Sequence, residues 1–415
     1  MSAATLPCGR RRLTGRVYNR PMDASARAAI HALPASRIRE VANAALGDPA
    51  VLPFWFGEPD AVTPSFIREA AKAALDAGDT FYHHNLGLPA LREAIAGYQS
   101  GLHRPVDAAR VVVTSSGVNA LMLAAQAVIG PGDRVVAVVP LWPNITEIPR
   151  ILGADVVRVP LSLDAARRRW ALDLDRLLAA VTPDTRAVIV NSPNNPTGWT
   201  MPAGQLRELA RHCARLGVWL ICDEAYERLV FDGNVCAPSI LDEQQAGDRV
   251  IVANTFSKTW QMTGWRLGWL TVPASLTADL AKLVEFNTSC APGFVQQAGV
   301  AAIAGGEAPI RVFTDALRER RDALVALLSA LPAVTLGVPD GAMYLFFRLD
   351  GEADSLALAR RLVRDAKLGL APGIAFGPEG EGFLRWCFAR PVEQLHEGAR
   401  RLRTALGQTA GTNTM

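Results

Sequence analysis

The chain has 415 residues, and its 43 lysines and arginines nearly balance its 40 acids, which leaves a formal net charge of +3 and gives no indication of nucleic-acid binding. Its length exceeds the roughly 250–300 residues at which one hydrophobic core stops growing, so we expect two packed lobes. The six cysteines are scattered and form no C-x-x-C pair, which favours a reduced, cytoplasmic setting over a disulfide framework or a zinc site. No apolar run is long enough to predict a membrane span.

Both ends of the chain differ from its middle. Residues 1–21 carry five arginines and no acid, which is the composition of a transit peptide or of a disordered or non-native extension upstream of a natural start at Met22. We favour the extension, because the helix-like pattern begins only after Met22. Residues 409–415 form a polar tail that we expect to be disordered.

The middle of the chain predicts a large α/β domain over residues 58–294. From Arg110 to Pro273, short β-branched runs alternate with amphipathic stretches such as Pro202–Leu216, which is typical of a mostly parallel sheet covered by helices. The predicted strands are Arg110–Thr114, Arg134–Val139, Ala187–Val190, Val218–Cys222, Val250–Asn254 and Leu267–Val272.

A smaller α+β domain is predicted from residues 295–408, completed by residues 22–57. Its expected strands are Tyr344–Leu349 and Phe383–Phe388. Its expected helices are Ser36–Leu46, Pro309–Leu331, Ser355–Lys367 and Val392–Leu406.

Lys258 follows one of these predicted strands, at the end where open α/β sheets bind ligands. A lysine there forms a Schiff base with an aldehyde cofactor if its pKa is low enough to supply free amine. Thr255, Ser257 and Arg266 stand near it and suit a phosphate dianion. The alternative is a solvated loop lysine, which these neighbours disfavour.

Asp223 and the turn Asn191–Gly198 follow two further strands. A carboxylate at a buried strand end needs a cationic partner, such as a protonated pyridine nitrogen, although a helix cap or an Asp–Arg pair is an equal alternative. The prolines and glycine of the turn predict a stiff loop that aims an amide side chain, or else a simple connection.

Together these motifs resemble the class I/II aminotransferases of pyridoxal-phosphate (PLP) fold type I, the aspartate-aminotransferase superfamily, over residues 36–406. No single motif is specific, but their order and spacing are. They are Gly57-Glu58-Pro59-Asp60, Tyr82 five residues before Gly87, Asn195-Pro196-Thr197-Gly198, Asp223-Glu224-Ala225-Tyr226, Ser257-Lys258 with Arg266, Ala371-Pro372-Gly373, and Arg385.

The resemblance implies a role for each matching residue around the cofactor. Lys258 would hold PLP as a Schiff base and then move a proton between the substrate Cα and the cofactor. Asp223 would pair with the pyridinium nitrogen, while Asn195 and Tyr226 would hydrogen-bond the ring oxygen. Trp142 would stack on the ring, although tryptophan is usually core filler.

The resemblance also implies how phosphate and substrate are bound. The phosphate would lie against Ser116, Gly117 and Val118 at a helix N-terminus, with Thr255, Ser257 and Arg266. Tyr82 would reach it from the neighbouring subunit, which implies a homodimer with shared active sites. Arg385 would bind the substrate α-carboxylate as a bidentate pair unless it is a surface arginine, and Gly57 would let the backbone approach, with Asn195 and Trp142 also at the substrate.

Val118 departs from the pattern of the bacterial aspartate-using branch, in which a lysine often stands there and binds the distal carboxylate. We therefore expect a neutral or aromatic amino donor rather than aspartate, with 2-oxoglutarate or pyruvate as acceptor. His83 and His84 either line the substrate entrance or are surface and packing residues.

The predicted function is a ping-pong PLP transaminase of amino-acid metabolism, with no metal. A carbon–sulfur β-lyase on the same scaffold is the nearest alternative, because fold does not fix chemistry. A non-catalytic PLP-binding regulator is a second, but too few residues precede the first matched segment for a three-helix DNA-binding module. No G-x-G-x-x-G after a strand, P-loop or H-E-x-x-H supports another enzyme class.

Overall fold

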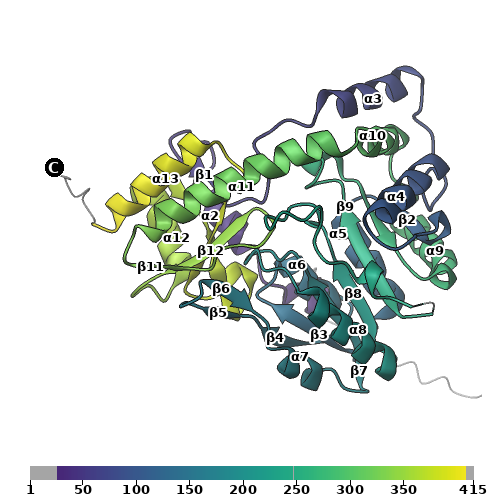
Figure 1. Cartoon of the computed structure of the whole chain (residues 1–415), viewed down its shortest axis with the longest axis horizontal. Helices are drawn as coiled ribbons and strands as arrows, with labels where there is room; N and C mark the ends of the chain where they lie inside the picture. The colour runs from purple at the N-terminus through teal and green to yellow at the C-terminus, as the bar shows by residue number, and fades with distance from the viewer. Residues whose placement is uncertain (1–25, 246, 408–415) are drawn as a thin grey trace, which may run out of the picture. The chain divides into compact units, whose positions relative to one another are not determined.

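The computed structural model describes residues 26–245 and 247–407, so the predictions for residues 1–21 and 409–415 lie outside the described residues. The chain divides into two compact units between Leu33 and Pro34. The short helix α1 (Ala28–His31) belongs to the first unit. Every other element described here belongs to the second (Figure 1).

A seven-stranded sheet forms the centre of the α/β part, which confirms the predicted mostly parallel sheet. Only β10 runs antiparallel, to its neighbours β2 and β9, while the remaining neighbours pair in parallel. The strand order is β2 (Val111–Thr114), β10 (Gly268–Thr271), β9 (Val250–Thr255), β8 (Trp219–Asp223), β7 (Thr185–Asn191), β3 (Arg134–Val139) and β4 (Asp155–Pro160).

Helices cover both faces of this sheet, because its strands bury side chains on both sides. One face packs against α5 (Gly117–Val128), α6 (Pro143–Ile151) and α9 (Thr277–Asn287). The other face packs in the main core with α3 (Ser65–Asp76), α4 (Pro89–Leu102), α8 (Ala203–Leu216) and α10 (Gly293–Ala304). In β3, for example, Val135 and Val139 face the first set while Val136 and Val138 face the second.

A four-stranded antiparallel sheet forms the α+β part near the C-terminus. Its order is β11 (Val334–Leu336), β12 (Tyr344–Leu349), β15 (Phe383–Cys387) and β14 (Ala371–Pro372). Its helices are α2 (Arg37–Asn43), α11 (Glu307–Ser329), α12 (Ser355–Ala366) and α13 (Val392–Ala405). The strands and helices expected here therefore form, with ends shifted by a few residues.

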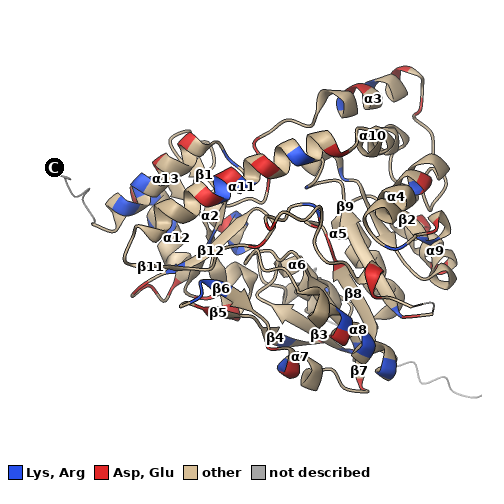
Figure 2. Cartoon of the chain, in the orientation of Figure 1, with Lys and Arg blue, Asp and Glu red and all other residues tan. Residues whose placement is uncertain are grey.

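The N-terminal segment joins this second sheet region. Strand β1 (Leu52–Pro53) pairs in parallel with β13 (Leu368–Gly369), and α2 packs against α12 and β14. Domain boundaries at residues 57/58 and 294/295 stay a prediction. Charged side chains of both signs are interspersed along α11 and α13 (Figure 2). Among the described residues, no helix has the length and apolarity needed to cross a membrane.

Candidate active site

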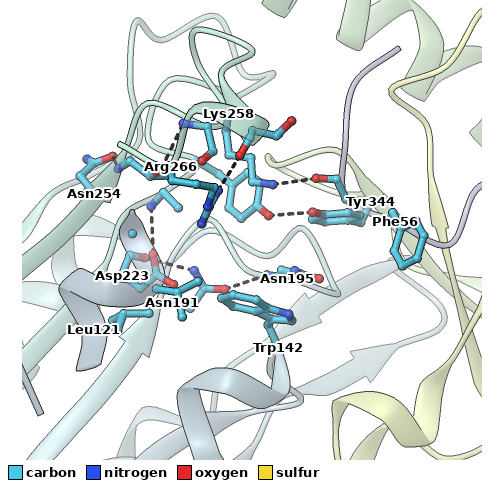
Figure 3. Close-up of a pocket in the computed structure, with 18 of the residues that line it drawn as sticks. Phe56, Leu121, Trp142, Asn191, Asn195, Asp223, Asn254, Lys258, Arg266 and Tyr344 are labelled. Carbon is cyan, nitrogen blue, oxygen red and sulfur yellow. Dashed lines mark hydrogen bonds between the residues drawn. The ribbon is translucent and has the colours of Figure 1, made fainter. Parts of the chain in front are cut away.

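A cavity of about 250 Å³ lies where several strands of the large sheet end (Figure 3). Its lining includes Asn191 and Asp223, the last residues of β7 and β8, and Thr255, the last residue of β9. Twelve predicted site residues line it together. They are Gly57, Gly117, Val118, Trp142, Asn195, Asp223, Tyr226, Thr255, Ser257, Lys258, Arg266 and Arg385.

Lys258 lies on the loop after β9 with its amine directed into the cavity. Its Nζ donates a hydrogen bond to the backbone carbonyl of Gly57 at 2.6 Å (Figure 3). Burial lowers the pKa of Lys258 to about 8, and the nearby guanidinium groups of Arg385 and Arg266 act in the same direction. Lys258 therefore has a larger share of free amine near neutral pH than an ordinary lysine, and the structure does not support a freely solvated loop lysine.

Asp223 is only 6% exposed, and burial raises its pKa to about 6. In the described part of the chain its carboxylate accepts one hydrogen bond, from the amide of Ala225 at 3.1 Å. That contact is not an Asp–Arg pair, and it does not cap a helix, because no helix begins here. A buried acid facing a cavity without a cationic partner is suited to a ligand that brings one.

The turn after β7 is fixed by its own side chains. Asn194 Oδ1 accepts hydrogen bonds from the amide and hydroxyl of Thr197, at 3.0 and 2.7 Å. The amide of Asn195 is in turn held by Asn191 Oδ1 at 2.8 Å. The turn is therefore more than a simple connection, because it holds the Asn195 side chain at the cavity wall.

Arg385 is 2% exposed, which excludes a surface arginine. Its Nη1 donates to Asn195 Oδ1 at 2.8 Å and its Nη2 to the carbonyl of Trp55, while Nε has no partner among the described residues. The guanidinium carbon lies 4.4 Å from the ring centre of Tyr344 and 4.8 Å from that of Phe376. The guanidinium thus packs against two rings, with one N–H donor unused among the described residues.

A group of residues with the chemistry to bind an anion, which we call the anion-binding corner, lies where α5 begins. Gly117 is its first residue, and Ser116 caps the helix through Oγ, which accepts from the amide of Asn119 at 3.1 Å. Thr255 Oγ1 donates to Ser257 Oγ at 2.9 Å, and Arg266 lines the same cavity. Ser116 itself does not line the cavity, so its place in the predicted phosphate site is indirect.

Tyr82 lies outside the cavity and is 88% exposed. Its reach into a neighbouring subunit stays a prediction. His83 and His84 do not line the cavity either. His83 Nε2 lies 2.5 Å from Asp79 Oδ1, and His84 Nδ1 accepts from the amide of Leu86, so both have local structural partners.

Several lining residues were not predicted from the sequence, among them Ile38, Phe56, Leu121 and Tyr344. The hydroxyl of Tyr344 lies 2.7 Å from that of Tyr226. Tyr344 and Phe346 are two residues apart on β12 and so face the same side of the sheet. Phe346 pairs with Arg385 of β15, which places all three side chains on one face. The signal that identifies Tyr344 is this strand pairing, which the sequence does not give.

Comparison with known proteins agrees with this geometry. Aspartate aminotransferase of Pyrococcus horikoshii is 32% identical over 375 residues, which cover 89% of this chain and 94% of the relative. Aromatic-amino-acid aminotransferase 2 of Thermococcus litoralis is also 32% identical, over 89% of this chain and 95% of its own length.

Solved structures agree as well. A single mutant of Thermus thermophilus aspartate aminotransferase superposes with a TM-score of 0.85 at 31% identity, covering 92% of this chain and 99% of that one. The family model for aminotransferase class I and II matches residues 51–402. With that match over most of its length, the chain belongs to the class I and II aminotransferase family.

Proposed function

We propose that this aminotransferase uses PLP to move the amino group of a neutral or aromatic L-amino acid to a 2-oxo acid, by a ping-pong mechanism, as a cytoplasmic homodimer. The observation that carries the proposal is the position of Lys258. Its amine has a lowered pKa and lies in the same cavity as a buried acid and an anion-binding corner.

The residues present fit PLP at three separate points. The Lys258 amine suits the aldehyde. The start of α5, the hydroxyls of Thr255 and Ser257, and Arg266 suit the phosphate dianion. Asp223, a buried acid without a cationic partner in the described chain, suits the ring nitrogen.

When bound, PLP supplies an electrophilic aldehyde and a ring that withdraws electrons from the substrate Cα. Lys258 would bind that aldehyde and, once released by the substrate amine, take the proton from Cα and return it to the cofactor. Asp223 would keep a proton on the ring nitrogen. Asn195 and Tyr226 would orient the ring through its oxygen.

Arg385 would hold the α-carboxylate and so keep the substrate Cα near Lys258. Two observations support this assignment: its Nε lacks a partner within residues 26–245 and 247–407, and Nη1 is already oriented by Asn195. Fixing Cα beside the base removes the entropic cost of bringing the two together.

The substrate preference rests on the charges that line the cavity. Its cationic side chains, in the part of the chain described, are Lys258, Arg266 and Arg385, and each already has a proposed partner. Val118, Ile38 and Phe56 add apolar lining instead of a further cation. A substrate side chain carrying a second carboxylate would therefore lack a counter-charge within this subunit.

The experiment is an absorbance spectrum of the purified protein with PLP, recorded after single amino acids and then 2-oxo acids. A yellow band that bleaches with phenylalanine or a neutral amino acid, returns with a 2-oxo acid, and is absent in Lys258→Ala supports the proposal. Aspartate as the best donor would refute the substrate preference. Keto acid released without any acceptor would identify a β-lyase, and PLP uptake without turnover a regulator.

A further inference from the structure

We infer that Tyr344 is a positioning residue that links the site for the substrate carboxylate to the site for the cofactor ring oxygen. The inference rests on the proposed function of Arg385 and Tyr226. It concerns a residue that neither the sequence motifs nor the proposed mechanism includes.

Tyr344 contacts three parts of the site at once. It is 1% exposed, and its hydroxyl lies 2.7 Å from the Tyr226 hydroxyl, with the two rings edge to face at 5.6 Å. The Arg385 guanidinium lies 4.4 Å from its ring centre. A Cβ on Gly57 would come within 1.9 Å of the Tyr344 oxygen, so only glycine fits beside it. The contact joins the two sheets, because Tyr344 begins β12 and Tyr226 follows β8.

With the cofactor bound, the two hydroxyls would donate hydrogen bonds in one direction, from Tyr344 to Tyr226 and from Tyr226 to the cofactor oxygen. Burial raises the pKa of Tyr344 to about 12 and that of Tyr226 well above its usual value, so both stay neutral. A phenol has one proton to donate. If Tyr226 donates its proton to the cofactor oxygen, the proton between the two phenols must come from Tyr344. Tyr344 then strengthens Tyr226 as a donor, because consecutive hydrogen bonds polarise one another.

The ring of Tyr344 has a separate effect on Arg385. The guanidinium lies between the rings of Tyr344 and Phe376, and strand pairing places Tyr344 diagonally across from Arg385 on the same face of the sheet. An aromatic ring at this distance attracts the guanidinium and restricts its movement without occupying its donors. The hydroxyl and the ring therefore act on different ligands, and two variants can separate them.

Tyr344→Phe removes only the hydroxyl. In the PLP-loaded enzyme we expect the midpoint of the pH titration of the visible absorbance band to rise by about half a pH unit, because a weaker Tyr226 donor leaves more negative charge on the ring oxygen. Binding of 3-phenylpropionate, a carboxylate without an amine, should change less than about twofold, since the ring remains over Arg385.

Tyr344→Leu removes the ring as well. We expect the dissociation constant of 3-phenylpropionate to rise about fivefold or more, with the same upward shift of the titration midpoint. Tyr98→Phe is the matched control. It also removes a buried hydroxyl, which donates to Glu227 at 2.7 Å, but Tyr98 does not line the cavity, and neither readout should move.

The outcomes separate the inference from the function on which it rests. Wild-type protein that takes up no PLP would refute both. If the wild type binds PLP and transaminates, the inference alone is overturned by a Tyr344→Phe midpoint equal to that of the wild type, by an equal shift in Tyr98→Phe, or by unchanged 3-phenylpropionate binding in Tyr344→Leu.

Discussion

Lys258 is the residue whose ionisation most directly governs the proposed chemistry. Its pKa of about 8 means that the neutral amine, the form that attacks an aldehyde, increases as the pH rises through that value. We therefore predict that the yellow band appears faster in cofactor-free protein mixed with PLP as the pH is raised from 7 to 9, with a midpoint near 8. Stopped-flow absorbance measures this rate. A rate that does not change over this range would contradict the prediction, and Lys258→Ala should show only the absorbance of unreacted PLP at every pH.

Asp223 gives a prediction about stability in the cofactor-free protein. Its folded pKa of about 6 lies above the ordinary value of 3.8, so the folded chain binds more protons than the unfolded chain between these values, and stability is lost as pH rises through that window. Asp223→Asn removes this loss. At pH 7.5 we expect the free energy of unfolding of the variant, measured by urea denaturation, to exceed that of the wild type by up to about 3 kcal/mol. At or below pH 4 the two proteins should have the same stability.

An exposed carboxylate provides the control for that measurement. Asp184→Asn, in the exposed turn before β7, should unfold like the wild type at both pH values. A gain for Asp223→Asn of equal size at pH 4 and pH 7.5 would show that its charge is not the cause.

Sequence reasoning found the residues that stand in rigid, strand-end motifs and missed those brought in by pairing. Asn195 and Asp223 were predictable as cavity residues because each follows a predicted strand, at the end of the sheet where ligands bind, although the residues alone left a helix cap, an Asp–Arg pair or a simple connection as alternatives. Tyr344 and Phe56 were not, because an aromatic residue on a strand reads as core until the facing surface is known. Ser116 and Gly117 were both predicted at the phosphate site; Ser116 caps α5 and Gly117 lines the cavity, and the phosphate contact of each stays a prediction.

At the scale of elements, β10 runs so close to the start of α5 that only glycine fits at its first position. A Cβ on Gly268 would lie 2.6 Å from the amide nitrogen of Gly117 and 2.8 Å from the carbonyl oxygen of Asn254, both backbone atoms that cannot turn aside. We predict that Gly268→Ala weakens PLP binding at least about tenfold and lowers the melting temperature, because overpacking displaces the helix start.

Gly264 is the matched glycine, since a Cβ there meets nothing within 4 Å. Gly264→Ala should leave both PLP affinity and melting temperature near those of the wild type. Fluorescence titration and thermal unfolding of the two variants measure these quantities. Equal behaviour of the pair would contradict the close approach.

The elements that the sequence predicted well are those with strong apolar runs buried on both faces. Arg134–Val139 and Tyr344–Leu349 form strands with the expected bounds. Strand β4 (Asp155–Pro160) was not predicted, because at the sheet edge its charged Asp155 and Arg158 break the apolar run. The antiparallel direction of β10 was also not predictable, since an apolar run carries no information on direction.

At the scale of the whole molecule, the exposed Tyr82 is expected to complete the site of a second subunit. We predict complementation between two weakened variants, Lys258→Ala and Tyr82→Ala. If equal amounts of the two variants pair at random, half of the dimers are mixed, and one of the two sites in each mixed dimer is native. We therefore expect about a quarter of wild-type activity. Refolding the two together and measuring turnover tests this.

Two outcomes would contradict the shared site. Activity equal to the average of the separately refolded variants would show that Tyr82 acts within its own subunit or not at all. Sedimentation of the wild type as a monomer would remove the premise.

The two walls of the cavity come from different parts of the architecture, and this separation bears on how such enzymes diverge. The seven-stranded sheet carries Asp223 at the end of β8 and Lys258 on the loop after β9, whereas the four-stranded sheet carries Tyr344 and Arg385. Mutations accumulating in one wall can alter which molecule is accepted while the other wall keeps the reaction. Variants in the N-terminal segment and the smaller sheet should therefore change the substrate range more often than they abolish activity. The exceptions are substitutions that break the Tyr344–Tyr226 or Arg385–Asn195 contact, which connects the two walls.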